Sequence, residues 1–151
     1  MIDITTEKLM QLASSTIQAG DVYRMQLTIK EGVKPKGEND VSRNKYFIVM
    51  GVSPDGSLIG FVLINSDVNK NIPVRARNSH YKIHVSDYPF LEQDRYVCCG
   101  ELKEIETSIF FERFRNGMIG KINDNHLEAI RGMIAMSANV STRILRDYNI
   151  I

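Results

Sequence analysis

Residues 46–64, YFIVMGVSPDGSLIGFVLI, form two near-continuous apolar runs separated by the turn sequence SPDG at 53–56. Apolar runs of this length on either side of a turn indicate two buried strands joined as a hairpin. Gly51 and Gly60 lie within the runs and predict bends or bulges, which a small sheet needs in order to curl. We therefore expect the hairpin to form the centre of a curled antiparallel sheet. The residues predicted for its core are Phe47, Val49, Phe61, Leu63 and Val97.

The segment before the hairpin predicts a helix, a strand and a loop. From 5 to 19 the apolar residues recur at spacings of three and four, and Gly20 follows as a helix stop. From Val22 to Ile29 apolar and polar residues alternate, which is typical of a half-buried strand. Residues 31–44 contain two glycines, a proline and charges of both signs without apolar periodicity, so we expect a long loop there.

The chain has a local cluster of basic residues on and beside this loop. The formal net charge is only +1, from 19 basic and 18 acidic residues, so no global field attracts nucleic acid and any polyanion site must be local. The alternative interpretation is a solvated loop whose cations only keep it hydrated. The cluster consists of Lys30, Lys34, Lys36, Arg43 and Lys45.

The second half of the chain predicts short strands followed by helices. Residues 80–85 alternate so that both of their histidines share the polar face of a strand. A helix begins at a cap formed by Asn123 or Asp124, and a last helix covers 140–148. The order helix, five or six short strands, helix indicates a mainly β fold of the α+β class. We expect a small curled antiparallel sheet or barrel with N-terminal and C-terminal helices.

Cys98 and Cys99 are adjacent in the run DRYVCCGELKEI, residues 94–105. Neighbours on a strand point to opposite faces, which is poor geometry for a disulfide between them, so we expect two free thiols. One is expected to pack as a small hydrophobe and neither to have a redox role. The cysteines and histidines lack the paired spacings of metal sites, so we expect no metal and no other cofactor.

Length and composition are those of one ordinary domain. The chain has 151 residues, of which 43% are hydrophobic and 25% charged, so we expect a single domain over 1–151. The first residues, MIDITTEKLM, lack the basic-then-apolar run of a secretory signal, and no apolar stretch is long enough to cross a bilayer. We therefore expect a cytoplasmic protein with no membrane partner.

Several short segments occur in a characteristic order along the chain. They are Gly20–Tyr23, Lys45–Met50 after the polar loop, Leu63–Ser66, Asp94–Val97, Leu102–Ile105 and Ile119–Ile122. Their order and spacing, from Gly20 to about Ser137, resemble the MazF/PemK family of toxin endoribonucleases. The resemblance implies an SH3-like barrel at about 20–137 with helical extensions at 5–19 and 140–148. It also implies a homodimer that cleaves single-stranded RNA without metal and is neutralised by a small antitoxin protein in its RNA groove.

The resemblance assigns three positions near the central hairpin. The basic residue that precedes the second strand in the family falls on Lys45, and Arg43 lies two residues earlier, so either could contact a phosphate. The small hydroxyl residue that ends the third strand falls on Ser66. Family chemistry needs a cation for the phosphorane charge and groups that move protons.

The acid and base of the PemK branch fall on Cys98 and Gly100, which cannot replace them. The neighbouring family positions fall on Glu101 and Lys103, so a carboxylate and a cation remain nearby. The catalytic residues that the resemblance implies are Lys45, Ser66 and Glu101. The RNA-binding residues that it implies are Arg43, Lys34, Lys36 and Lys103.

Two other functions are compatible with the same resemblance. The first is a non-catalytic SH3-like barrel that binds RNA or a protein through the same groove. The second is a topoisomerase poison, because the CcdB toxin shares the barrel. A fold hosts many functions, so the site residues must discriminate among these possibilities.

Overall fold

The computed structural model describes residues 5–34, 37, 40–66, 79–114 and 117–151. In chain order, with η for a 3₁₀ helix, the elements are α1 (Thr6–Thr16), β1 (Asp21–Leu27), η1 (Ile29–Glu31), β2 (Arg43–Val52), β3 (Leu58–Asn65), β4 (His80–Ile83), η2 (Val85–Asp87), β5 (Arg95–Cys98), β6 (Lys103–Glu106), α3 (Thr107–Arg113), β7 (Gly120–Lys121), α4 (Asp124–Ala135) and α5 (Thr142–Asp147). Among the described residues, no helix has the length and apolar character that crossing a membrane requires.

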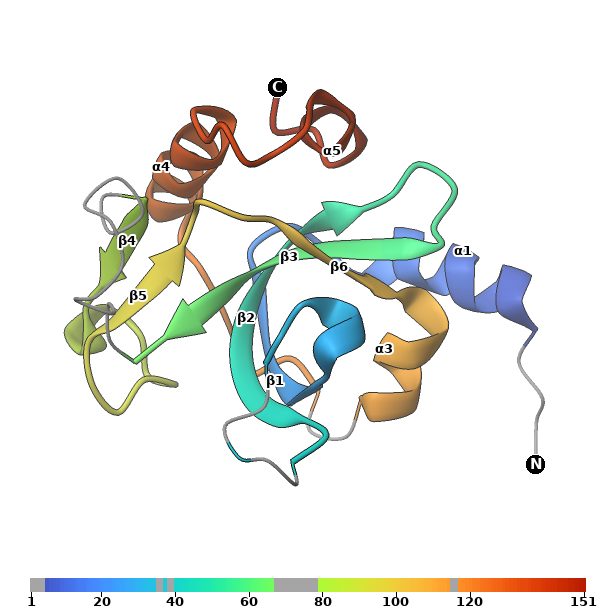
Figure 1. The fold of residues 1–151 in the computed structure, drawn as a ribbon, viewed down its shortest axis with the longest axis horizontal. Helices are drawn as coiled ribbons and strands as arrows, with labels where there is room; N and C mark the ends of the chain where they lie inside the picture. The colour runs from blue at the N-terminus through green and yellow to red at the C-terminus, as the bar shows by residue number, and fades with distance from the viewer. Residues whose placement is uncertain (1–4, 35–36, 38–39, 67–78, 115–116) are drawn as a thin grey trace.

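The strands form one antiparallel sheet in the order β4-β5-β3-β2-β1-β7, and β6 also pairs with β3. At its centre lies the predicted hairpin of β2 and β3. Val49 pairs with Phe61 and Gly51 pairs with Gly60, so the ladder has a bulge at Met50. The sheet curls into half a barrel with helices beside it (Figure 1), which confirms the predicted fold class.

Alternation along the hairpin divides the core between two faces of the sheet. Ile48 and Val62 belong to a hydrophobic cluster that α4 and α5 cover. Phe47 and Phe61 belong to a second cluster that α1 and α3 cover, and Figure 1 shows the two helix pairs in separate places around the sheet. Of the five residues predicted for the core, one, Leu63, is half-buried. The other four are fully buried: Phe47, Val49, Phe61 and Val97.

Helices α1 and α4 both begin at a side-chain cap, and the cap of α4 is Asn123, one of the two residues predicted for it. The Thr5 side chain accepts a hydrogen bond from the Lys8 N–H at 3.3 Å, at the start of α1. The Asn123 side chain accepts one from the His126 N–H at 2.9 Å, at the start of α4. Both caps satisfy backbone donors that a first helical turn leaves without partners.

Helix α3 was not predicted. Its sequence, TSIFFER, is too short for its apolar residues to distinguish helix from strand. The hydroxyl of Thr107 donates to the Gly56 carbonyl at 2.6 Å, which ties the start of α3 to the β2–β3 turn. Phe110 then packs edge-on against Tyr23, with ring centroids 4.9 Å apart. Tertiary contacts therefore select the helix.

The predicted strand at 80–85 is two residues shorter in the structure. β4 ends at Ile83, and Val85 begins η2. The N–H of Val85 donates to the Asp94 carboxylate at 2.8 Å instead of to a neighbouring strand. This hydrogen bond turns the chain away from the sheet.

Tyr148, just after α5, fastens the last helix to the hairpin. Its side chain is 2% exposed and lies over the Gly51–Gly60 pair, where a Cβ atom on Gly60 would collide with its ring. Its hydroxyl donates a hydrogen bond to Glu104 Oε2 at 2.6 Å. Glycine at position 60 is therefore needed for close packing between the sheet and Tyr148.

Gly60→Ala should destabilise the protein by about 1–3 kcal/mol. A Cβ atom at this position would lie 2.7 Å from Cε1 of the buried Tyr148 ring. The matched control is Gly132→Ala in α4, because an added Cβ there meets no atom within 4 Å. Alanine at that position should stabilise the protein by up to about 1 kcal/mol. Urea unfolding measures both changes, and effects of the same sign would contradict the packing of Tyr148 on the hairpin.

Candidate functional site

Lys45 is held in place at the end of the central hairpin. It lies near the start of β2, opposite Asn65 at the end of β3, because Tyr46 pairs with Ile64 in the antiparallel ladder. Its side chain is 9% exposed, and its Nζ donates a hydrogen bond to Asn65 Oδ1 at 2.7 Å. The hydrogen bond thus fixes the ammonium group in position. Its partner Asn65 directly precedes the exposed Ser66.

Arg43 lies at the same end of the sheet. Alternation along β2 places it on the Lys45 face, and its side chain is half-buried. Three of the predicted site residues, Arg43, Lys45 and Ser66, therefore come together where β2 begins and β3 ends. We call this end of the sheet the β2–β3 rim, defined by residues 43–46 and 65–66 together with Arg24 and Arg95, described below.

Glu101 and Lys103 lie elsewhere on the sheet. Lys103 pairs with Phe61, four residues along β3 from Asn65, which corresponds to about 13 Å of strand. Its Nζ lies 3.1 Å from Glu101 Oε2 and donates to the Gly32 carbonyl at 2.9 Å. The predicted carboxylate is therefore paired with the predicted cation and is not in the same cluster as Lys45.

The two remaining predicted residues belong to the segment after η1. Lys34 is exposed and follows Val33, which is buried in the second hydrophobic cluster. The Lys103 contact with Gly32 places this segment near β6. Lys36 lies outside the described residues.

Sequence reasoning missed an aromatic ring with two cations at the rim. The guanidinium carbon of Arg24 lies 5.0 Å from the centre of the Tyr46 ring, and that of Arg95 lies 4.8 Å from it. Arg24 and Tyr46 are directly paired between β1 and β2, whereas Arg95 comes from β5. With its amide oxygen turned toward Arg24, Asn44 accepts hydrogen bonds from Nε and Nη2 at 3.1 and 3.2 Å.

The charges of this stack are not neutralised by nearby carboxylates in the described part of the chain. None of its ion pairs includes Arg24, Arg43 or Arg95. Nε of Arg95 is buried and has no hydrogen-bond partner among these residues. Guanidinium groups that flank an aromatic ring, with no ion pair among the described residues, suit a ligand with both anionic and planar parts.

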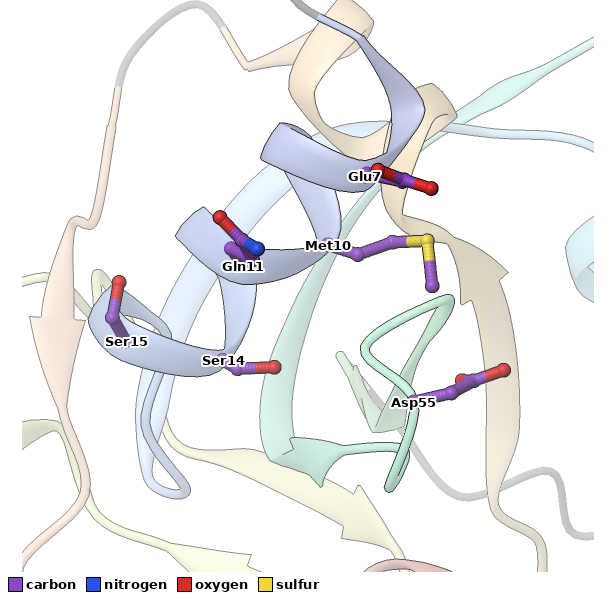
Figure 2. A pocket seen from close by; sticks show the side chains of 6 residues that line it. All are labelled: Glu7, Met10, Gln11, Ser14, Ser15 and Asp55. Atoms are coloured by element: carbon purple, nitrogen blue, oxygen red, sulfur yellow. The ribbon is translucent and has the colours of Figure 1, made fainter.

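A hollow at the other end of the hairpin, between α1 and the β2–β3 turn, is less suited to such a ligand. Met10 extends from α1 toward the turn that carries Asp55 (Figure 2). Hydrogen bonds from Ser57, and a further one from Ser53, hold the pKa of Asp55 below its usual range, so this carboxylate stabilises the turn. Among the described residues, those that line the hollow include no basic side chain: Glu7, Met10, Gln11, Ser14, Ser15 and Asp55.

Metal ligands and known relatives do not define the site. Within the described ranges, no group of three or more His, Cys, Asp or Glu side chains is placed to hold a metal ion. No model of a known protein family matches the sequence, and no curated protein matches it. The functional argument therefore rests on the residues of the rim.

Proposed function

We propose that the protein binds single-stranded RNA at the β2–β3 rim. The stack of Arg24 and Arg95 on Tyr46 carries this proposal. Proteins hold single strands by stacking bases on aromatic side chains and by pairing the phosphates with cations. The stack offers both chemistries within one residue cluster, and Arg43 and Lys45 extend the positive charge along β2.

We further propose that the protein cleaves the bound RNA without a metal ion, as the toxin of a toxin–antitoxin pair. Lys45 supports this step. When a 2′-hydroxyl attacks the adjacent phosphate, negative charge develops on the phosphorane, and a cation that is already fixed stabilises that charge with little reorganisation. The hydrogen bond to Asn65 fixes Lys45 in this way, and the exposed Ser66 hydroxyl is available to donate to a phosphate oxygen.

The proposal includes the partners that the family resemblance implies. A small antitoxin protein would cover the rim and exclude RNA, and a second copy of the chain would complete a homodimer. An acidic antitoxin segment would meet the same arginines, Arg24 and Arg95, that the RNA would use.

The position of Glu101 favours a second candidate, a non-catalytic RNA-binding module. Cleavage requires a group that accepts the 2′-hydroxyl proton and one that protonates the leaving oxygen. Glu101 is instead paired with Lys103 at 3.1 Å and is separated from Lys45 along β3. A module that binds RNA through the rim needs no proton transfer.

Arg24→Gln should weaken RNA binding and reduce the slope of log affinity against log salt by about 0.7, because one phosphate contact is lost. Arg146→Gln in α5 is the matched control. It removes the same charge from an exposed arginine that has no ion pair among the described residues. Fluorescence anisotropy with a labelled mixed-sequence RNA, measured at several salt concentrations, gives both slopes. Equal slopes for the two variants would argue against the rim as the RNA site.

Lys45→Ala should lower the rate of RNA cleavage about 100-fold, beyond its effect on affinity, because it removes charge stabilisation from the transition state. Lys34→Ala is the control and should leave the cleavage rate at saturating protein unchanged, because Lys34 is an exposed lysine outside the rim. The measurement is cleavage of a long mixed-sequence RNA in EDTA at saturating protein, with 5′-end mapping of the fragments.

The wild-type reaction discriminates between the two candidates. Discrete fragments in EDTA would support the toxin, whereas bound but intact RNA would support the non-catalytic module. Wild-type protein that does not bind the RNA at low salt would contradict both.

A further inference from the structure

His80 and Cys98 face each other across two neighbouring strands. His80 is the first residue of β4 and Cys98 the last of β5, and the two are direct partners in the antiparallel ladder. Directly opposed residues project to the same face with Cβ atoms about 5 Å apart. An imidazole and a thiol are therefore held together by the sheet itself, and both side chains are half-buried.

Burial disfavours ionisation of the Cys98 thiol, but hydrogen bonds outweigh it. The neighbouring His80 side chain, through polar interaction and charge, and the backbone N–H of Gly100 favour the thiolate, so the pKa of Cys98 is lowered from its usual value. Glu101 is the carboxylate that opposes this ionisation. Its own charge is offset by Lys103, whose Nζ lies 3.1 Å away.

The backbone around this thiol is fixed. The N–H of Cys99 donates to the Ser79 carbonyl at 2.9 Å, and the hydroxyl of Ser137 donates to the Gly100 carbonyl at 2.7 Å. A Cβ atom on Gly100 would lie 2.7 Å from Ser79 Oγ, so a larger residue there would displace the Ser79 hydroxyl. The N–H that stabilises the Cys98 sulfur is thus held in position.

Cys99 has the opposite properties. It is 0% exposed, and its thiol donates weakly to the Val97 carbonyl at 3.6 Å. Burial, with a further contribution from the charge of Cys98, raises the pKa of Cys99 to about 12. The chain therefore offers an internal control, because Cys99 is a buried neutral thiol next to Cys98, which pairs across the sheet with His80.

We propose that Cys98 is a site of oxidative modification, at which His80 assists the reaction of the thiolate with a small hydroperoxide. The thiolate attacks the terminal peroxide oxygen, an S–O bond forms and the O–O bond breaks. The sulfur loses two electrons, which the peroxide gains, and the leaving oxygen takes the proton of the His80 imidazolium. The products are a sulfenic acid on Cys98 and water or an alcohol.

Cys99 cannot resolve this sulfenic acid, because it points to the other face of the strand. A small-molecule thiol would instead condense with the sulfenic acid, which forms a mixed disulfide and releases water. Cys98 shares its sheet face with Tyr96, which pairs with Asn65 of the rim, so the modification would lie beside that site. The redox chemistry of Cys98 itself does not depend on RNA binding.

The test is alkylation of the native full-length protein with iodoacetamide, followed by peptide mass spectrometry. We expect one modified residue, Cys98, with a rate at pH 6 to 7 above that of an unstructured cysteine peptide and a titration midpoint at lower pH. Each unit by which the pKa is lowered raises the thiolate fraction about tenfold below the pKa. Hydrogen peroxide followed by dimedone should label the same residue.

His80→Gln should reduce the alkylation rate at pH 6 about tenfold and move the midpoint to higher pH. His84→Gln is the control, because His84 is exposed near Asp94 and should leave both unchanged. Cys98→Ser should abolish labelling. The proposal is overturned if wild-type Cys98 reacts no faster than the peptide, if Cys99 is labelled equally, or if a folded His80→Gln variant reacts like wild type. The wild-type pH profile alone decides the matter if His80→Gln does not fold.

Discussion

The pairing of β2 with β3 is the constraint on which the rest of the structure depends. Both strands are buried on both faces, so each contributes side chains to both hydrophobic clusters. A register slip of one residue would move every side chain to the wrong face, and the two clusters therefore stabilise the same register. The Gly51–Gly60 pair belongs to this register, and the missing side chain of Gly60 leaves the space that the Tyr148 ring occupies.

The same strand period determines the electrostatics of the rim. Lys45 and Tyr46 are neighbours in β2 and therefore face opposite sides of the sheet. Lys45 meets Asn65 on one side, and Tyr46 meets Arg24 and Arg95 on the other. The cations consequently surround the strand ends instead of forming a patch on one face. A flexible single strand can follow such a surface, whereas a rigid duplex contacts only one side of it.

The two cysteines illustrate how strongly the direction of a side chain changes its chemistry. Cys98 faces His80 and the Gly100 N–H, which favour its thiolate, whereas Cys99 faces the hydrophobic core, which favours its neutral thiol. From the sequence we expected no redox role for either residue. Neither thiol is in a disulfide. The cross-strand pairing with His80 provides a reason to propose such a role for Cys98.

The sequence by itself determined the central hairpin, the curled sheet class, the N-terminal helix and the helix capped at Asn123. These features depend on local hydrophobic period, turn residues and caps, which operate over a few neighbouring residues. Only the tertiary structure decided that the run at 107–113 is helical, because Gly56 and Tyr23 contact it from other elements. Strand register, which is a property of the whole sheet, likewise decided which side chains meet. The resulting contacts are Arg24 and Arg95 with Tyr46, Lys45 with Asn65, and His80 with Cys98.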